Sequence, residues 1–387
     1  IETLISFAAF FAFTALAYRQ ILDGWFVADD FLWLELSNVD SVLASFTGPW
    51  GHGRAYRPLT RVTYLLDFWL YGKHFTGWIL TNMVLHAMVC TALYCLGFLI
   101  WHDRVTAVIL AVLFCLSPIA AENVAWISGR THILSALFTV LSMLAVWSFL
   151  RGRGHWALLP VGVSLFAAGL LCYEAAAHGI AFCAVAVASV TWQRRSVDMR
   201  SLMTLGAFAV VFLAYLMIRE TALSSVTHAF STPREPSWAG LVRDVRLSAN
   251  ILFGWSQLAL PLVMLGATAL VLRPILITAT AFAYSVLILV SLLPFLVLEH
   301  MGTRFFYSAQ VFVVAFAAVA GRELLRDRRI WVRWCGGAFL CFMLFNSVDR
   351  IGQVTRDWRD SGAIARSLAV QVKSMFPRHP VGCLLYT

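Results

Sequence analysis

Charged residues are scarce in this 387-residue chain: Asp, Glu, Lys and Arg make up 13%, against 60% hydrophobic residues and a mean hydropathy of +0.79. The core of a soluble protein needs far less apolar sequence. Here apolar residues repeatedly fill windows of about 20 residues, the length that crosses a bilayer. The composition therefore excludes a soluble domain and predicts an all-α polytopic membrane protein. The apolar runs are continuous rather than alternating, which excludes an outer-membrane barrel.

The sequence also lacks the motifs of several enzyme classes. It contains neither G-x-x-x-x-G-K-[ST] nor G-x-G-x-x-G, which disfavours a nucleotide-driven pump and a Rossmann cofactor. Serine hydrolase motifs are missing as well. No C-x-x-C spacing occurs, and seven of the eight cysteines lie in apolar runs, so we expect packing residues rather than a disulfide framework or a zinc site.

Positive charge exceeds negative charge, with a formal net charge of +9. In a soluble protein this excess would suggest a nucleic-acid partner. Here most arginines lie in short loops between apolar runs, where they set topology and contact lipid headgroups. We therefore expect membrane lipid as a partner, and no nucleic acid.

Hydropathy predicts about eleven transmembrane helices. They run near residues 2–21, 76–100, 105–121, 132–150, 156–172, 175–192, 202–218, 249–272, 275–298, 305–320 and 330–348. We expect the first to be a retained span. The arginine-rich connections alternate with the others, so they should face the cytoplasm. We expect a multi-pass protein of the bacterial inner membrane with its outer face in the periplasm, or of the ER membrane and lumen in a eukaryote.

The predicted outer face carries all the unusual polar residues. Its first loop, residues 23–75, is long and rich in aromatic residues, which suit the membrane interface. Pro58 favours the start of a helix that continues to Gly72, and we expect this helix to lie along the membrane surface. We take residues 1–348 as a transmembrane catalytic domain. Residues 349–387 then form an outer tail, either a small cap or the start of a truncated domain.

An adjacent pair of carboxylates, Asp29 and Asp30, follows the first span. Near an apolar surface the proton affinities of such a pair separate, so that one acid stays ionised as a general base and the other orients it. Two alternatives stay open. The pair is a solvated turn, or it binds a divalent metal such as Mg or Mn, for which two acids alone make a poor cage. No other cofactor is indicated.

Arg57 and Arg61 are one turn apart at the start of the helix predicted from Pro58. Guanidinium groups match phosphate oxygens in a bidentate manner, so this pair predicts a phosphate contact. Snorkelling of both side chains toward lipid headgroups is the alternative.

Three further outer turns carry polar residues at membrane depth. Ser117-Pro118 breaks a span before Glu122 and Arg130, which either line a cavity or pair with each other. For the other turns, substrate contact and an interhelical ion pair are equally compatible with the sequence. Those turns contain Glu174 and His178, and then Glu299, His300, Arg304 and Tyr307. Asn82 and His86, on the second span, favour helix packing.

Acids and arginines on one face fit group transfer from a phosphate-linked donor. An arginine would hold the anionic leaving group near the lipid, and a carboxylate would deprotonate an incoming hydroxyl. Soluble nucleotide sugars have little access to an outer membrane site. We therefore expect a polyprenyl-phosphate-linked sugar as donor, and a protein, lipid or glycan as acceptor.

The order of these residues also resembles a known family. The residues that carry the resemblance are Asp29-Asp30, Tyr56-Arg57-Pro58-Leu59, Asn82, His86, Pro118, Glu122, Val124, Gly129-Arg130, Glu174 and Arg304-Phe305-Phe306-Tyr307. The set, which covers nearly all of the chain, is similar to the GT-C glycosyltransferases. Within them it resembles the protein O-mannosyltransferases and the transmembrane and tetratricopeptide-repeat mannosyltransferases.

The resemblance implies a GT-C-like helical bundle and an inverting sugar transfer on the outer side. It implies one acid of the Asp29-Asp30 pair as the base. We prefer Asp29, the first acid of the family-like pair, with Asp30 orienting the acceptor or a metal. Arg57 and Arg304 are then candidate donor-phosphate contacts. The chain departs from the pattern in three places. Ser117 replaces a frequent His, His132 a frequent acid and Tyr173 a frequent Lys.

Two functions of other classes remain as alternatives. A transporter or flippase of a lipid-linked glycan would bind in the same outer cavity without reacting, although such proteins usually show internal repeats and this chain shows none clearly. A non-catalytic scaffold would tolerate Ala at the acidic pair.

Overall fold

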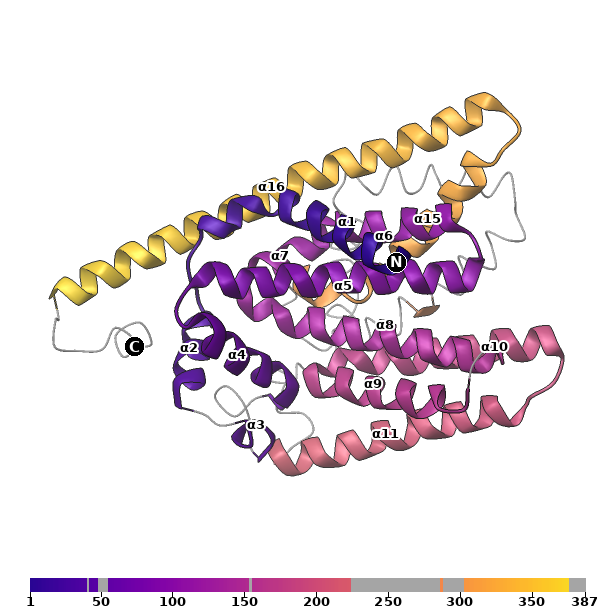
Figure 1. Ribbon diagram of the computed structural model, residues 1–387, viewed down its shortest axis with the longest axis horizontal. Helices are drawn as coiled ribbons and strands as arrows, with labels where there is room; N and C mark the ends of the chain where they lie inside the picture. The colour runs from indigo at the N-terminus through magenta and orange to yellow at the C-terminus, as the bar shows by residue number, and fades with distance from the viewer. Residues whose placement is uncertain (40–41, 48–54, 153–154, 224–285, 288–302, 376–387) are drawn as a thin grey trace, which may run out of the picture.

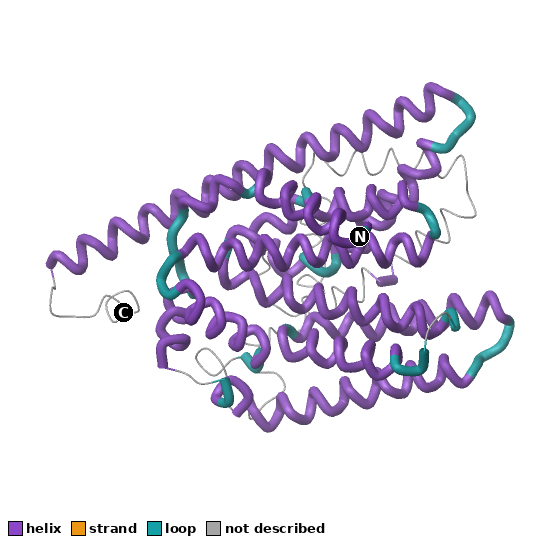
Figure 2. The backbone as a smooth tube through the Cα atoms, in the orientation of Figure 1, coloured by secondary structure: helices purple, strands orange, loops and turns teal. Residues whose placement is uncertain are grey.

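The computed structural model describes residues 1–39, 42–47, 55–152, 155–223, 286–287 and 303–375. Its α-helices are α1 Glu2–Ala17, α2 Asp30–Val39, α3 Ala44–Thr47, α4 Pro58–Tyr71, α5 Phe75–Trp101, α6 Arg104–Cys115, α7 Ala121–Ala125, α8 Arg130–Leu150, α9 Leu158–Cys172, α10 His178–Arg194, α11 Met199–Leu223, α15 Gln310–Leu325 and α16 Ile330–Met375. Short 3-10 helices join them: η1 Arg19–Asp23, η2 Pro118–Ala120, η3 Ile127–Gly129, η4 Glu174–Ala177 and η6 Thr303–Phe306. These residues form helices and no β-strand, which confirms the all-α prediction (Figure 2).

Five of the described helices are long and apolar enough to cross a membrane, or six if α6 and the bent segment after it count as one span. Helices α1 and α9 are shorter apolar helices. The spans predicted at 249–272 and 275–298 lie outside the described residues. The total of eleven therefore stays a prediction, whereas an integral membrane protein follows from the helices that are described.

The helices run side by side as an elongated bundle with α5 and α8 inside it (Figure 1). One buried cluster joins α1, α5, α6 and α15, and a second joins α8, α9, α10 and α11. Interhelical contacts such as Gly162 against Val146 let α8 and α9 approach closely, because a Cβ at Gly162 would lie only 3.0 Å from the Val146 side chain.

The break predicted at Ser117-Pro118 is present. Helix α6 ends at Cys115, and the segment from Pro118 to Ala125 bends away from it by 43°. Ser117 caps the turn, since its Oγ accepts from Ile119 N at 3.3 Å. Its Oγ also donates to Gln310 Oε1, which ties the break to α15.

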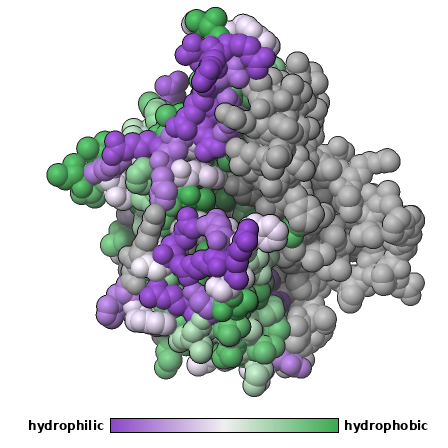
Figure 3. All heavy atoms as spheres, turned by 90° about the vertical axis from the view of Figure 1, so that its right-hand side faces the viewer, coloured by the Kyte–Doolittle hydropathy of each residue, from purple (hydrophilic) through white to green (hydrophobic). Residues whose placement is uncertain are grey.

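The arginine-rich turns meet at one end of the bundle. Arg326 of the α15–α16 turn donates to Asp103 Oδ1 at 2.8 Å, which joins that turn to the start of α6. Arg194 donates to Leu150 O at 2.9 Å, which joins the end of α10 to the end of α8. Figure 3 views this end, where hydrophilic side chains gather in separate clusters above a largely hydrophobic part. We call it the arginine-rich end.

The opposite end carries α2, α3 and α4 (Figure 1). The helix predicted from Pro58 is confirmed as α4, with Pro58 at its first turn and Gly72 as its C-terminal cap at φ +56°. Such a backbone conformation suits glycine.

Helix α16 differs from the predicted last span. It does not end near residue 348 but continues to Met375 as one helix of 46 residues. At 1.5 Å per residue it is about 69 Å long, more than twice the hydrocarbon thickness of a bilayer. The first part of the predicted tail therefore extends the last span as a rigid helix.

Candidate active site

The two adjacent acids point in different directions. Asp30 is buried, with 1% of its surface exposed, whereas Asp29 is exposed. Ala28, directly before the pair, has a left-handed φ of +48°, a conformation that is strained for a residue with a Cβ. Helix α2 begins at the pair, because the carbonyl of Asp29 accepts from Leu32 N at 3.0 Å and from Trp33 N at 3.3 Å.

Both carboxylate oxygens of Asp30 are fixed. Its Oδ2 accepts from Val27 N at 3.1 Å, and its Oδ1 accepts from Ser128 N at 3.3 Å and from Ser128 Oγ at 3.0 Å. Trp33 Nε1 in turn donates to Ser128 Oγ. Burial raises the pKa of Asp30 to about 7, although these hydrogen bonds partly oppose the shift. Asp30 is therefore a positioned side chain, and Asp29 is the acid that solvent or substrate reaches.

Arg57, the residue before α4, forms a double contact with Glu174 at the start of η4. Its Nε and one terminal nitrogen each lie 3.3 Å from a Glu174 oxygen. Its guanidinium also lies 4.5 Å from the centre of the Tyr173 ring. Arg219 of α11 approaches the same carboxylate at 3.6 Å. Glu174 therefore receives two arginines, of which Arg57 keeps 22% of its side chain exposed.

Glu122 of α7 pairs with Arg304 of η6. Its Oε1 accepts from Arg304 Nη1 at 3.0 Å, and its Oε2 accepts from Arg304 N at 3.0 Å and from Thr303 Oγ1. The Arg304 guanidinium lies 5.1 Å from the ring centre of Trp126, and 35% of this arginine's side chain is exposed. Arg304 is thus oriented by Glu122 without being enclosed.

Contacts and short chain links connect these groups, which together we call the patch. Trp126 lies two residues before Ser128, the partner of Asp30, and contacts Arg304 on its other side. The His132 ring contacts both Phe305, at 5.6 Å between ring centres, and Tyr173, at 4.4 Å. A chain of contacts therefore leads from Asp30 past Arg304 to Arg57. His132 and Tyr173, two of the three departures from the family pattern, touch each other within it.

Arg130 does not belong to this patch. It is completely buried and pairs with Asp67 of α4, not with Glu122, so the expected alternative of a Glu122–Arg130 pair is wrong. It also donates to Asn82 Oδ1 at 2.8 Å, to Thr63 O at 3.2 Å and to Trp78 O at 2.9 Å. With its donors satisfied inside the protein, this arginine ties α8 to α4 and α5.

Three other predicted residues are also enclosed. His178 is buried and its Nδ1 contacts Ala175 O, while its ring packs against Phe312. Tyr307 is completely buried, with its hydroxyl 2.6 Å from His86 Nδ1. Arg61 is 9% exposed, and burial lowers the pKa of its guanidinium. Glu299 and His300 lie outside the described residues.

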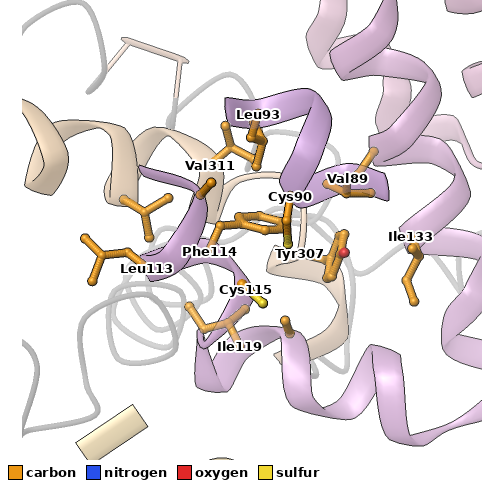
Figure 4. Close-up of a cluster of buried hydrophobic side chains, with 14 of the residues drawn as sticks. Val89, Cys90, Leu93, Leu113, Phe114, Cys115, Ile119, Ile133, Tyr307 and Val311 are labelled. Atoms are coloured by element: carbon orange, nitrogen blue, oxygen red, sulfur yellow. The ribbon is translucent and has the colours of Figure 1, made fainter. Parts of the chain in front are cut away.

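Asn82 and His86 are packing residues, as expected. Asn82 donates to Trp126 O at 3.0 Å, and His86 Nε2 lies 3.1 Å from Cys115 O. Cys90 and Cys115 lie beside His86, with ligand atoms of the three within 4.8 Å of one another, in a core that Figure 4 shows between Phe114 and Tyr307. Both ring nitrogens of His86 already have hydrogen-bond partners, so these three residues are packing residues of the core.

Two residues that hold buried charged groups were missed in the sequence: Ser128, which holds Asp30, and Asp67, which holds Arg130. Ser128 is an ordinary residue of an outer turn, and only the folded chain brings it to Asp30 across 98 positions. Asp67 carried a usable signal, because an acid between Leu66 and Phe68 in an apolar helix must find a partner. Among the described residues, no third His, Cys, Asp or Glu joins Asp29 and Asp30 in a ligand group.

The chain is similar to several known proteins. No family model matches the chain. Protein O-mannosyl-transferase Tmtc2 of Drosophila melanogaster is 31% identical over 268 residues, which cover 63% of this chain and 28% of that protein. Human protein O-mannosyl-transferase TMTC1 is 33% identical over 147 residues, which cover 34% of this chain and 17% of that protein. The chain thus spans less than a third of the length of these relatives.

Among solved structures, ArnT from Cupriavidus metallidurans, determined bound to undecaprenyl phosphate, matches with a TM-score of 0.54. The match covers 96% of this chain and 81% of ArnT at 12% identity, so it shows the fold. The expected resemblance to GT-C glycosyltransferases and to protein O-mannosyltransferases is confirmed, and the fold is GT-C-like.

Proposed function

We propose that this chain acts as a glycosyltransferase that moves a sugar from a polyprenyl-phosphate-linked donor to an acceptor hydroxyl on the non-cytoplasmic face. One observation carries the proposal: an exposed Asp29 stands beside a buried, fixed Asp30 in a patch that also presents the partly exposed Arg57 and Arg304. A base and a holder for an anionic leaving group are what this transfer requires.

In the proposed step Asp29 is the general base. The acceptor oxygen attacks the anomeric carbon while its proton passes to the Asp29 carboxylate. The bond from that carbon to the phosphate oxygen breaks, and the polyprenyl phosphate leaves with the electron pair. Attack opposite the leaving group inverts the anomeric configuration. Asp30 is buried and its oxygens are held by Val27 and Ser128, so in this proposal it does not meet the acceptor hydroxyl.

Arg304 and Arg57 are the proposed phosphate contacts. Each is oriented by one carboxylate, Glu122 or Glu174, and each retains exposed guanidinium surface. Pre-oriented guanidinium groups stabilise charge that develops on a leaving phosphate without reorganising at the moment of reaction. Arg130 and His178 take no part in this step, because they are buried in contacts within the protein.

The acceptor class is proposed from the relatives. Both mannosyltransferases named above are protein O-mannosyl-transferases, so a protein hydroxyl is the acceptor we propose first. The patch needs no bound metal for this step as written, because Asp29 and the arginines supply the base and the counter-charge. A divalent cation at the acidic pair would add a second way to orient the acceptor.

The donor is tested directly with purified protein in detergent. Labelled polyprenyl-phosphate mannose and a labelled nucleotide sugar are each incubated with a hydroxyl-bearing peptide. We expect label on the peptide from the lipid donor only, with inverted configuration by NMR. Transfer from the nucleotide sugar alone would contradict the proposal. Movement of an intact lipid-linked sugar across vesicles without bond cleavage would instead show a transporter.

A further inference from the structure

A groove separates α10 from α11 near the arginine-rich end. Its volume is about 900 Å³, within the range of about 300–1,000 Å³ typical of small-molecule sites. Its walls are apolar, formed by Val187 and Ala188 of α10 and by Leu205 of α11. The residues that line the groove belong to the end of α10 and the turn after it. That turn lies at the opposite end of the bundle from α2, which begins at Asp30 (Figure 1). It is therefore separate from the proposed donor site.

A cation stands at the polar end of this groove. Arg195 follows the last turn of α10 in a left-handed conformation, φ +54°, and is exposed. No acidic side chain in the described part of the chain pairs with it. Its neighbours are engaged elsewhere: Arg194 pairs with Asp198, and Arg200 donates to Phe149 O at 2.8 Å. Arg195 is thus an uncompensated charge beside an apolar cleft.

Two more lining residues suit the boundary between headgroups and acyl chains. Trp192 is 86% exposed at the rim, and indole rings concentrate at the membrane interface. Thr191 Oγ1 is buried in the groove wall without a hydrogen-bond partner among the described residues. A buried hydroxyl usually finds a partner, so we expect the Thr191 side chain to turn toward the groove when a polar group of a ligand lies there.

We propose that the groove binds an anionic glycerophospholipid from the leaflet at the arginine-rich end. One acyl chain lies between α10 and α11 against Val187 and Leu205, and the phosphate contacts Arg195 with the Thr191 hydroxyl near the glycerol backbone. The charge favours this occupant, because residues 194–200 contain three arginines and one aspartate. A zwitterionic lipid would fill the same apolar space but would leave more of this positive charge unbalanced.

The test is native mass spectrometry of the full chain released from nanodiscs that contain equal parts of phosphatidylglycerol and phosphatidylcholine. We expect retained phosphatidylglycerol to exceed phosphatidylcholine by about fivefold, the effect of one arginine near an anionic lipid. Arg195→Ala should abolish this preference. Arg328→Ala is the matched control, because it removes the same charge from an exposed position in the α15–α16 turn and should keep the preference.

A second variant tests the apolar part. Ala188→Trp fills the groove while leaving Arg195 in place, and it should lose retained lipid of both kinds. Its thermal unfolding in lipid-free detergent confirms folding. The proposal is overturned if wild-type protein retains both lipids equally, if Arg195→Ala keeps the preference, if folded Ala188→Trp retains phosphatidylglycerol, or if added undecaprenyl phosphate displaces phosphatidylglycerol completely.

Discussion

Two carboxylates that are neighbours in sequence have different surroundings in the fold. Asp29 is exposed and Asp30 is buried, directly after the left-handed residue Ala28. Ser128 holds Asp30 through its backbone and its hydroxyl. This difference in burial supports the proposal that Asp29, the first acid of the pair, is the base.

The buried acid should make stability depend on pH. Since the folded pKa of Asp30 is about 7, above its ordinary value, the folded state holds the proton more tightly than the unfolded state. The contribution of Asp30 to the free energy of unfolding is fully present below about pH 4 and is lost as pH rises through about 7. Between pH 4 and 8, wild-type protein should lose up to about 4 kcal/mol from this group. Asp30→Asn should lack that loss in denaturant unfolding; parallel pH profiles of the two proteins would contradict it.

The Arg130–Asp67 pair should stabilise the fold. Arg130→Met leaves the buried Asp67 carboxylate without its partner, and we expect the free energy of unfolding to fall by about 3–5 kcal/mol. Asp67→Asn in the same protein should restore part of it, because neither charge then remains unpaired. Arg328→Met, at an exposed position, is the control. If the free energy of unfolding of Arg130→Met lies within about 1 kcal/mol of the wild-type value, the pair does not stabilise the fold.

At the scale of elements, helix α16 runs past the end of the bundle that carries α2, and we call its part beyond residue 348 the outer half, after the predicted topology. Trp358, in the half of α16 beyond residue 348, stacks on Trp126 at 5.3 Å between ring centres. Trp126 in turn contacts Arg304, so α16 reaches the proposed phosphate-binding arginine through one intervening ring. The helix also passes directly over η1 and the residues after it, where Gly362 lies against the backbone of Trp25.

The close approach at Gly362 gives a second structural test. A Cβ there would lie 2.7 Å from Trp25 N and 2.9 Å from Trp25 O, so Gly362→Ala must push α16 away from the site. We expect faster proteolysis of the outer half of α16 and transfer activity reduced at least tenfold. Gly337→Ala is the control on the same helix, because nothing lies within 4 Å of its Cβ position. Equal behaviour of the two variants would mean that the outer half of α16 does not support the site.

At the scale of the whole molecule, local signals predicted the helices and the break at Pro118, whereas partners across the fold were not predictable. Pro58 and Gly72 mark both ends of α4 in the sequence itself. Arg130 pairs with Asp67 rather than with Glu122 because of which helices face each other in the fold. Hydropathy carries no information about that. The same holds for Ser128 beside Asp30. The end of α16 was missed because its polar continuation resembles a loop by hydropathy alone.

The orientation of the bundle remains a prediction with a direct test. The arginine-rich turns should face the cytoplasm, since positive loops are retained there. In a cysteine-free background, Ser196→Cys of the α10–α11 turn should react with a membrane-impermeant maleimide only after the membrane is opened. Glu35→Cys of α2, at the opposite end, should react in intact cells. The reverse pattern would place the acidic pair in the cytoplasm and contradict a lipid-linked outer donor.

If Asp29 takes the acceptor proton, Asp29→Asn should transfer sugar slowly. The initial rate from polyprenyl-phosphate mannose should fall by about 100- to 10,000-fold, the usual contribution of a general base. Asp23→Asn, at an exposed acid six residues earlier, should keep the wild-type rate. A wild-type rate for correctly folded Asp29→Asn would contradict the account.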